Sequence, residues 1–365
     1  MKILIVKPSS LGDVIQALPV LRLLKLHYPA SEIYWWLAAE LAPLLEGDPD
    51  LAGVIPFDRR AGGSLLRWVK FFGSIRRLRA ERFDLVIDLQ GLARSAVVAW
   101  LANADLSIGL DNAREGGREG ARGFYDLLAP RSLLGAHAVD RYLSALAALG
   151  LPSGGRFEWL PVRPAAAAEV AARWGPIEGQ WVILLPGARW DNKRWPPEYF
   201  SELVRLLLQE EPALNFAIMG GPADRALGAS IAATAPGRCL NLTGRTSLPE
   251  MIEWIRLAGL LITNDTGPMH VGAALGKPVV ALFGPSDPAN TAPFGQMSNV
   301  LQNRALPCVP CRKSHCAYVE PLACLRSLEP AVVCAAARRL LRRAAEPERL
   351  TFSNGADRLP ARAGG

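Results

Sequence analysis

The chain has 365 residues, of which 50% are hydrophobic, 21% charged and 7% aromatic. At ~150 residues per domain this suits a globular protein of two domains, and it excludes a wholly disordered chain, a collagen-like repeat and a small disulfide-stapled scaffold. With 41 Lys and Arg against 34 Asp and Glu, the net charge is +7, which suits an anionic ligand or membrane surface without requiring nucleic acid.

The N-terminus lacks the pattern of a secretion signal, because only the four apolar residues 3–6 stand before the next charge, at Lys7. No stretch approaches the ~18 consecutive apolar residues of a transmembrane helix. We therefore expect a cytoplasmic protein, in which the six cysteines remain thiols or bind metal.

The first half of the chain alternates β-branched runs with apolar helical patterns. The predicted strands are 2–7, 32–37, 53–57, 84–89 and 106–110, and the predicted helices are 14–29, 64–82, 93–103 and 137–149. The second half repeats the alternation, with strands at 181–186, 215–219, 239–243, 260–264 and 278–283 and helices at 197–211, 223–234, 248–258 and 267–275. This alternation is typical of parallel sheets covered by helices on both faces.

The segment 151–180, rich in Pro, Gly and Ala, is expected to link the two halves and lead into a short helix. We predict an α/β protein of two doubly wound, Rossmann-like domains, 1–165 and 166–345, facing each other across a ligand-binding cleft, with a flexible tail at 346–365. The glycine fingerprint of nicotinamide enzymes, the nucleotidase P-loop and the nucleophile elbow of α/β-hydrolases are all absent from the sequence, which disfavours those three classes.

The loop after the first predicted strand reads PSSLGD, residues 8–13. Gly12 permits close backbone approach, and Asp13 lies at or just inside the N-terminus of the following helix. Two interpretations are open. Asp13 is either a helix cap worth ~1 kcal/mol or a general base that faces the cleft.

A second loop, GARWDNKRWPP at 187–197, follows the strand at 181–186 and leads into a helix that begins with proline. Lys193 could donate to a diphosphate as a point charge. The alternative is a solvated loop in which Trp195 packs against the start of the helix.

A third loop, TNDTGPMH at 263–270, again joins a strand to a helix. The N-terminus of that helix has free N–H groups and a positive dipole end, and Gly267 has no side chain to block a phosphate. Asp265 could cap the helix, while the amides of Thr266 and Gly267 could hold a phosphate. Two phosphate-compatible loops on one sheet edge favour diphosphate binding over a plain capped helix.

Four segments together resemble glycosyltransferase family 9, the ADP-heptose:lipopolysaccharide heptosyltransferases of Gram-negative bacteria. They are KPSSLGDV at 7–14, DLQGLARSA at 88–96, PGARWDNKRWP at 186–196 and NDTGPMHVGAALGKPVVALFGPSDP at 264–288. The resemblance covers about residues 1–345. It implies the GT-B fold, inversion at the anomeric carbon, no cofactor and no catalytic metal.

The resemblance also assigns roles to residues. Asp13 falls on the general base. The implied donor-binding residues are Ala188, Arg189, Lys193, Asp224, Asp265, Thr266, Gly267 and His270, and family members often carry hydroxyl residues where this chain has Ala188 and Arg189. The acceptor-side residues are Ser10, Gly12, Arg59, Arg60, Arg94 and Arg114.

The resemblance makes ADP-L-glycero-β-D-manno-heptose the expected donor and Kdo-lipid A, or another inner-core glycolipid of lipopolysaccharide, the expected acceptor. Three alternatives stay open: a family-9 transferase of another sugar in polysaccharide or O-antigen assembly, a nucleotide-sugar epimerase of the same architecture, and a non-catalytic sugar-nucleotide sensor.

A basic stretch at 59–82 is interleaved with apolar residues. Its cations are Arg59, Arg60, Arg67, Lys70, Arg76, Arg77, Arg79 and Arg82, against the single acid Glu81. One interpretation is a helix with a core face and a solvated basic face. We favour a surface that contacts anionic lipid headgroups, at the cytoplasmic face of the inner membrane, and an acidic acceptor.

Five of the six cysteines lie between residues 308 and 334. Cys308, Cys311, Cys316 and Cys324 could form a structural tetrahedral zinc site, with His315 as an alternative ligand. The other interpretation is a set of reduced thiols in an irregular connection. In both cases the segment is expected to be structural, far in sequence from the transfer chemistry.

Overall fold

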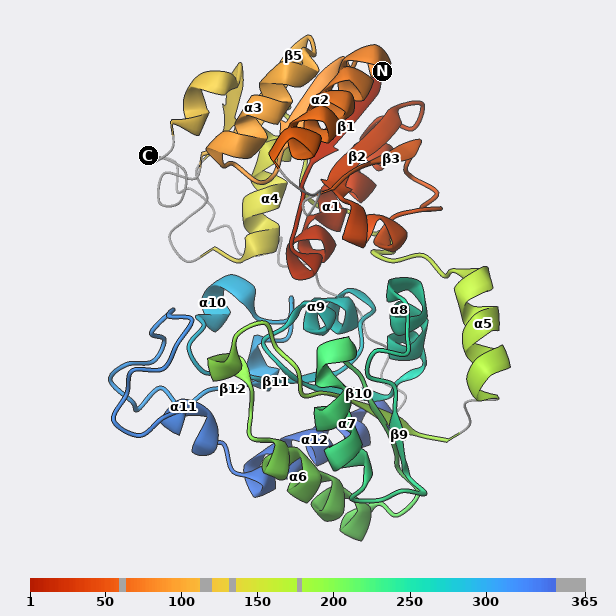
Figure 1. Ribbon diagram of the computed structural model, residues 1–365, viewed down its shortest axis with the longest axis vertical. Helices are drawn as coiled ribbons and strands as arrows, with labels where there is room; N and C mark the ends of the chain where they lie inside the picture. The colour runs from red at the N-terminus through yellow and green to blue at the C-terminus, as the bar shows by residue number, and fades with distance from the viewer. Residues whose placement is uncertain (59–63, 112–119, 131–135, 176–178, 346–365) are drawn as a thin grey trace, which may run out of the picture.

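The computed structural model describes residues 1–58, 64–111, 120–130, 136–175 and 179–345. These residues form two lobes, each with a six-stranded sheet whose neighbouring strands are all parallel (Figure 1). The predicted α/β class with two doubly wound sheets is confirmed.

The first sheet has the strand order β3-β2-β1-β4-β5-β6. Its strands are β1 (Lys2–Val6), β2 (Glu32–Ala38), β3 (Gly53–Phe57), β4 (Leu85–Asp88), β5 (Leu106–Leu110) and β6 (Leu127–Ala129). The helices between and after them are α1 (Leu11–His27), η1 (Ala39–Leu44), α2 (Ser64–Glu81), α3 (Ala93–Ala102), η2 (Ala121–Phe124) and α4 (Ala138–Ala147). Because the chain winds outward in both directions from β1 and β4, a crevice is expected at their carboxyl ends, where the loop 8–13 begins.

The second sheet has the order β12-β11-β10-β7-β8-β9. Its strands are β7 (Trp181–Leu185), β8 (Asn215–Ile218), β9 (Cys239–Asn241), β10 (Leu260–Asn264), β11 (Val279–Leu282) and β12 (Val300–Leu301). Its helices are α5 (Pro164–Trp174), η3 (Asp191–Lys193), α6 (Pro197–Glu210), η4 (Pro222–Asp224), α7 (Arg225–Ala232), α8 (Leu248–Leu257), α9 (Gly267–Ala274), α10 (Pro288–Thr291), η5 (Met297–Asn299), α11 (Ala323–Arg326) and α12 (Pro330–Ala345). Here the switch point lies between β7 and β10, the two strands that the Lys193 and Asp265 loops follow.

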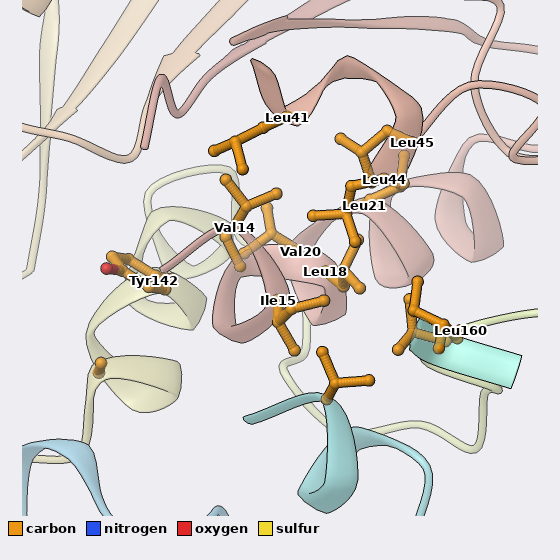
Figure 2. Close-up of a cluster of buried hydrophobic side chains, with 14 of the residues drawn as sticks. Val14, Ile15, Leu18, Val20, Leu21, Leu41, Leu44, Leu45, Tyr142 and Leu160 are labelled. Atoms are coloured by element: carbon orange, nitrogen blue, oxygen red, sulfur yellow. The ribbon is translucent and has the colours of Figure 1, made fainter. Parts of the chain in front are cut away.

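Helix α1 is buried along most of its length because it has no polar face. It packs against α4 of its own lobe and against α9 of the other (Figure 1). Figure 2 shows Val14 and Leu21 pointing toward Leu41 and Leu44 of η1, while Ile15 points away from them. One hydrophobic cluster extends from the first sheet through α1 to the second sheet. Helix α1 therefore carries its N-terminus to the contact between the lobes.

The segment that joins the lobes is held by an arginine from each side, one buried and one half-buried. Arg22 of α1 forms an ion pair with Asp48 and donates to the carbonyl of Trp159 at 2.9 Å. Arg256 of α8 donates to the carbonyl of Leu160, also at 2.9 Å. These bonds fix the connection where it passes between α1 and α8.

The predicted elements are all present, with small differences at their ends. The predicted helix 223–234 is divided into η4 and α7, and the predicted strand 239–243 ends at Asn241. Strands β6 and β12 and helices α10, α11 and α12 were not predicted. None of the described helices is long and apolar enough to cross a lipid bilayer.

Candidate active site

Asp13 lies in the first turn of α1, where it forms a capping box with Ser10. One carboxylate oxygen, Oδ2, accepts hydrogen bonds from the backbone N–H of Ser10 at 2.9 Å and from its hydroxyl at 2.7 Å. The capping interpretation of Asp13 is therefore confirmed. The side chain remains 38% exposed, so capping does not remove it from contact with a ligand.

The other oxygen of Asp13, Oδ1, faces two groups from distant parts of the first lobe. The hydroxyl of Tyr142 on α4 donates to it at 2.9 Å, and the ammonium of Lys7, after β1, lies 3.9 Å away. Burial alone would raise the pKa of Asp13, but Lys7 and the donors from Ser10 and Tyr142 bring this pKa below its ordinary value. Asp13 is therefore a carboxylate at neutral pH.

The loop that carries Lys193 is held at both ends by a buried asparagine. Asn264, the last residue of β10, donates to the carbonyl of Pro186 at 2.7 Å and accepts from the N–H of Trp195 at 3.0 Å. The ring of Trp195 is buried edge-to-face against Tyr199 and Phe200 of α6. The predicted packing of Trp195 on the helix start is confirmed, and it anchors the loop.

Lys193 and Asp265 bring the two predicted phosphate loops together. The ammonium of Lys193 donates to Oδ2 of Asp265 at 2.6 Å, and it lies 4.8 Å from the ring centroid of Trp190. Asp265 is buried, whereas the Lys193 side chain keeps 19% of its surface exposed. A cation therefore stands beside the N-terminus of α9.

Helix α9 begins at Gly267, with Thr266 as its N-cap residue. The hydroxyl of Thr266 does not cap the helix. The first backbone N–H groups of a helix have no partner within it, so those of Thr266 and Gly267 suit an anion. A Cβ at Gly267 would come within 3.0 Å of Leu11, so this helix start also meets α1.

His270 joins the two loops across the lobes. Its imidazole packs against Gly12, where a Cβ would lie 2.5 Å from ring atom Cδ2. The residue is 7% exposed, and burial lowers the pKa of its imidazole to about 4, so the ring is neutral at physiological pH. His270 therefore brings the first turns of α1 and α9 together, and its ring lies within the electrostatic reach of Asp13, Asp265 and Lys193.

The remaining donor-side residues lie along the same edge of the second sheet. The Asp224 carboxylate accepts from the N–H of Gly221 at 2.9 Å and lies 2.6 Å from the position of a Cβ at Gly187, in the Lys193 loop. Ala188 is buried, and its carbonyl accepts from Arg194, while Arg189 is exposed. The structure thus brings Asp224 to the loop of Lys193.

The acceptor-side residues are described only in part. Ser10 and Gly12 flank Asp13, and Arg94 is exposed on α3. Arg59, Arg60 and Arg114 lie outside the described residues.

Helix α2 has the two faces that its sequence predicts. Ile75 and Leu78 are buried, and the exposed cations are Arg76, Arg77, Arg79 and, after the helix, Arg82. Phe72 on this helix is 59% exposed, and Trp100 on the adjacent α3 is 60% exposed. The core face is confirmed, and the lipid contact stays a prediction.

The cysteine segment lies closer to the site than its place in the sequence suggests. Cys308, Cys311, Cys316 and Cys324 line one small cavity together with Asn192 and Pro285. Asn192, which precedes Lys193, donates to the carbonyl of Lys313 at 2.9 Å. The segment is thus far from Lys193 in sequence but in contact with its loop in space.

The zinc interpretation of these cysteines stays a prediction. In the part of the chain that the structure describes, no three His, Cys, Asp or Glu side chains are arranged to hold a metal ion. All six cysteines are free thiols, and burial raises the pKa of Cys324 to about 11, so this thiol stays protonated. The four thiols meet at one cavity, and both the reduced-thiol and the zinc interpretation stay predictions.

Three residues that support the site were not among the predicted ones. Lys7 and Asn264 had a readable signal, because each is a polar residue at the end of an otherwise apolar strand. Tyr142 had none, because its place beside Asp13 depends on how α4 packs against α1.

Comparisons with known proteins agree with this geometry. The sequence matches the model of glycosyltransferase family 9 (heptosyltransferase) over residues 72–320. It is 32% identical over 330 residues to lipopolysaccharide heptosyltransferase 1 of Pseudomonas aeruginosa, covering 87% of this chain and 88% of that protein. It is 30% identical over 319 residues to lipopolysaccharide heptosyltransferase 2 of Salmonella typhimurium, covering 83% of this chain and 88% of that protein.

The structure is similar to solved structures along nearly its whole length. It matches Escherichia coli ADP-heptose lps heptosyltransferase II with a TM-score of 0.75 at 26% identity, covering 95% of this chain and 100% of that one. It matches E. coli heptosyltransferase WaaC with ADP-2-deoxy-2-fluoro heptose with a TM-score of 0.73 at 25% identity, covering 93% and 99%. The likeness includes both lobes.

Proposed function

Because the chain belongs to glycosyltransferase family 9, the heptosyltransferases, we propose that it transfers a heptose from ADP-L-glycero-β-D-manno-heptose to the Kdo/heptose inner core of lipopolysaccharide. The relatives named for lipopolysaccharide align over more than four fifths of this chain. The observation that carries the proposal is the contact of two helix starts: α1 brings Asp13, and α9 brings the loop beside Lys193.

In the proposed reaction Asp13 is the general base and the anomeric carbon is inverted. The acceptor hydroxyl attacks that carbon and gives its proton to the Asp13 carboxylate. The bond between the carbon and the diphosphate oxygen breaks, and its electron pair leaves with ADP. The base and the leaving group lie on opposite sides of the sugar, which suits residues supplied by two lobes.

The proposed leaving-group site consists of Lys193 and the amides of Thr266 and Gly267. They supply a cation and a helix N-terminus where negative charge develops on the departing diphosphate. We propose that this set acts without a metal ion. Asp224 would contact the ribose or the sugar from the end of β8, and His270 would border the reacting centre.

The proposed acceptor site lies on the first lobe, which we assign to residues 1–165, and the donor site on residues 166–345. Helix α5, which begins at Pro164, packs against α8 of the second lobe and supports this division. The exposed arginines of α2, with Phe72 beside them, suit the anionic cytoplasmic face of the inner membrane, where a glycolipid acceptor is embedded. We therefore propose a peripheral membrane enzyme.

The experiment that tests the proposal measures ADP release from ADP-heptose with and without Kdo-lipid A, in buffer with and without EDTA. Acceptor-dependent release that EDTA does not change supports the whole proposal. If ADP release depends on the acceptor but is faster from another ADP-sugar, the donor is a different sugar. Isomerisation without acceptor indicates an epimerase, and binding without turnover indicates a sensor. Activity abolished by EDTA and restored by a divalent cation contradicts the metal-free mechanism.

A further inference from the structure

The two oxygens of the Asp13 carboxylate have different surroundings. Oδ2 accepts two hydrogen bonds from Ser10, one from the backbone N–H at 2.9 Å and one from the hydroxyl at 2.7 Å. Oδ1 accepts one, from the hydroxyl of Tyr142 at 2.9 Å. A carboxylate oxygen has two lone-pair sites. The capping bonds therefore occupy Oδ2, whereas Oδ1 keeps a place for one further donor.

Lys7 adds a fixed positive charge on the side of Oδ1. Its side chain is 3% exposed, and its ammonium lies 3.9 Å from that oxygen and 4.4 Å from the ring centroid of Tyr142. The same ammonium donates to the carbonyl of Leu89, which follows β4, at 3.2 Å. Lys7 is therefore held between the two central strands of the first sheet and cannot swing away from Asp13 as an exposed lysine does.

We propose that Lys7 and Tyr142 are positioning residues that make Oδ1 of Asp13 the atom that receives the acceptor proton. The inference rests on the proposed function, in which Asp13 is the base. The hydroxyl of Tyr142 fixes the rotation of the carboxylate from one side, the capping bonds of Ser10 fix it from the other, and Lys7 keeps it ionised. The lone pair left on Oδ1 then points to a single position for the acceptor hydroxyl.

This arrangement makes the Asp13 carboxylate a weaker base but fixes its orientation toward the acceptor hydroxyl. Donors and a cation around a carboxylate stabilise its charged form, so they make it a weaker base. Holding the reacting atoms in line contributes more to the rate, since effective concentrations in well-oriented reactions are very large. After the transfer, Oδ1 carries the proton, the acceptor oxygen carries the new bond to the sugar, and ADP carries the electron pair of the broken bond.

The other ionisable groups near Asp13 do not compete for this role. His270 of α9 faces it from the second lobe, and burial lowers the pKa of that imidazole to about 4, so the ring is mainly neutral over all but the acidic end of the assay range. Lys193, also on that side, donates to Asp265 at 2.6 Å. Helix α4 contributes Tyr142, and α1 itself contributes the Ser10 hydroxyl.

The experiment compares Lys7→Met and Tyr142→Phe with the wild type in steady-state transfer from pH 4.5 to 8.5. Without Lys7, the burial that raises the pKa of Asp13 is no longer opposed by its main cation, so the acidic limb of the rate profile is expected to move to higher pH. Lys7→Arg should restore the wild-type profile. A purely structural role would lower the rate equally at every pH.

Tyr142→Phe is expected to lower kcat about tenfold while leaving KM for the ADP-sugar within twofold, because it loosens the base and not the donor site. Tyr28→Phe, at the other end of α1, is the matched control and should keep wild-type kcat. Replacing Tyr142 with 3-fluorotyrosine, a stronger donor, should retain kcat. All these variants keep the aromatic ring, so we expect them to fold. The melting temperature of each variant checks this.

Two outcomes overturn the inference and one overturns its premise. If Asp13→Asn is inactive while Tyr142→Phe keeps wild-type kcat, Tyr142 does not position the base. If the Lys7→Met variant folds and has the wild-type pH profile, Lys7 does not keep Asp13 ionised. If Asp13→Asn itself retains wild-type turnover, the proposed base is wrong and the fault lies in the proposed function.

Discussion

The imidazole of His270 occupies the space that a side chain at Gly12 would need. A Cβ on Gly12 would lie 2.5 Å from ring atom Cδ2, closer than such atoms approach, so position 12 tolerates only glycine while the ring is in place. The two residues belong to different lobes. Their contact sets how near Asp13 comes to the loop of Asp265.

We expect Gly12→Ala to separate the first turns of α1 and α9 and to lower turnover about tenfold, since small misplacements of reacting groups are costly. Gly73→Ala is the matched control, because no atom of the described residues lies within 4 Å of a Cβ there and a helix favours alanine over glycine. Turnover and melting temperature are measured for both. Wild-type turnover in Gly12→Ala would show that this contact does not set the reacting geometry.

Asp13→Asn is expected to lower kcat by ~10²-fold or more while donor affinity is nearly unchanged. Because Asp13 also caps α1, the variant loses some stability. A control must therefore show whether such a loss of stability by itself lowers turnover. Ser247→Ala weakens the capping box of α8 by removing its N-cap hydroxyl, which accepts from the N–H of Glu250. It should cost about 1 kcal/mol of stability and leave turnover intact. An Asp13→Asn variant within threefold of wild-type kcat would leave Asp13 as a cap alone.

Lys193→Ala should weaken ADP and the ADP-sugar by the same factor, about ten- to a hundredfold, because both share the diphosphate. Isothermal calorimetry of ADP binding measures the change. Arg205→Ala serves as the control, since Arg205 is an exposed cation on α6 paired with Glu202. Unchanged ADP affinity in Lys193→Ala would mean that this loop does not hold the phosphates.

Charge reversal at Arg76, Arg77 and Arg79 should release the protein from anionic vesicles. Each basic side chain near such a surface contributes ~1 kcal/mol, and exposed charges are screened beyond ~8 Å at physiological ionic strength. Binding should therefore weaken with salt, and transfer to a membrane-embedded acceptor should slow while transfer to a short soluble acceptor does not. Reversal of the exposed Arg339 and Arg342 of α12, at the far end of the molecule, is the control (Figure 1). Equal slowing with both acceptors would place the α2 arginines in the active site or the fold.

His270 makes stability depend on pH in a predictable direction. The pKa of this imidazole falls from 6.5 to about 4 on folding, chiefly through burial. Between these values the unfolded chain binds a proton that the folded chain does not, so the free energy of unfolding falls as the pH is lowered from about 6.5 to 4. His270→Gln should reduce that fall by up to about 3 kcal/mol, as measured by urea unfolding at several pH values. Parallel curves for wild type and variant would mean that the ring titrates normally.

The sequence was most informative where the pattern of apolar side chains alone determines the secondary structure. Runs such as residues 3–6 and 260–263 can only be buried strands, and a loop that follows such a strand lies at the ligand edge of a parallel sheet. This is why Asp13, Lys193 and Asp265 were found. The two- and three-residue strands β12 and β6 are too short to have a period. Helix α12 had a signal, since Val333, Ala337 and Leu340 recur at helical spacing, but it was not predicted.

What sequence could not provide is the pairing of distant residues. Tyr142 reaches Asp13 across 129 residues, and its partner depends on the angle at which α4 crosses α1. The ion pair of Lys193 with Asp265 joins loops 72 residues apart. Both contacts arise from packing in three dimensions, which local patterns do not encode.

The residues that anchor the Lys193 loop also determine when this loop can fold during synthesis. Asn192 is held by the carbonyl of Lys313, and the indole N–H of Trp195 donates to the carbonyl of Leu328. On the ribosome, the strands of the first sheet all emerge by residue 129, so that sheet can fold while the rest is translated. The loop of Lys193, by contrast, cannot form its bonds to Lys313 and Leu328 until more than a hundred further residues have been translated. A nascent chain can therefore form its first sheet well before the loop of the proposed nucleotide site is anchored.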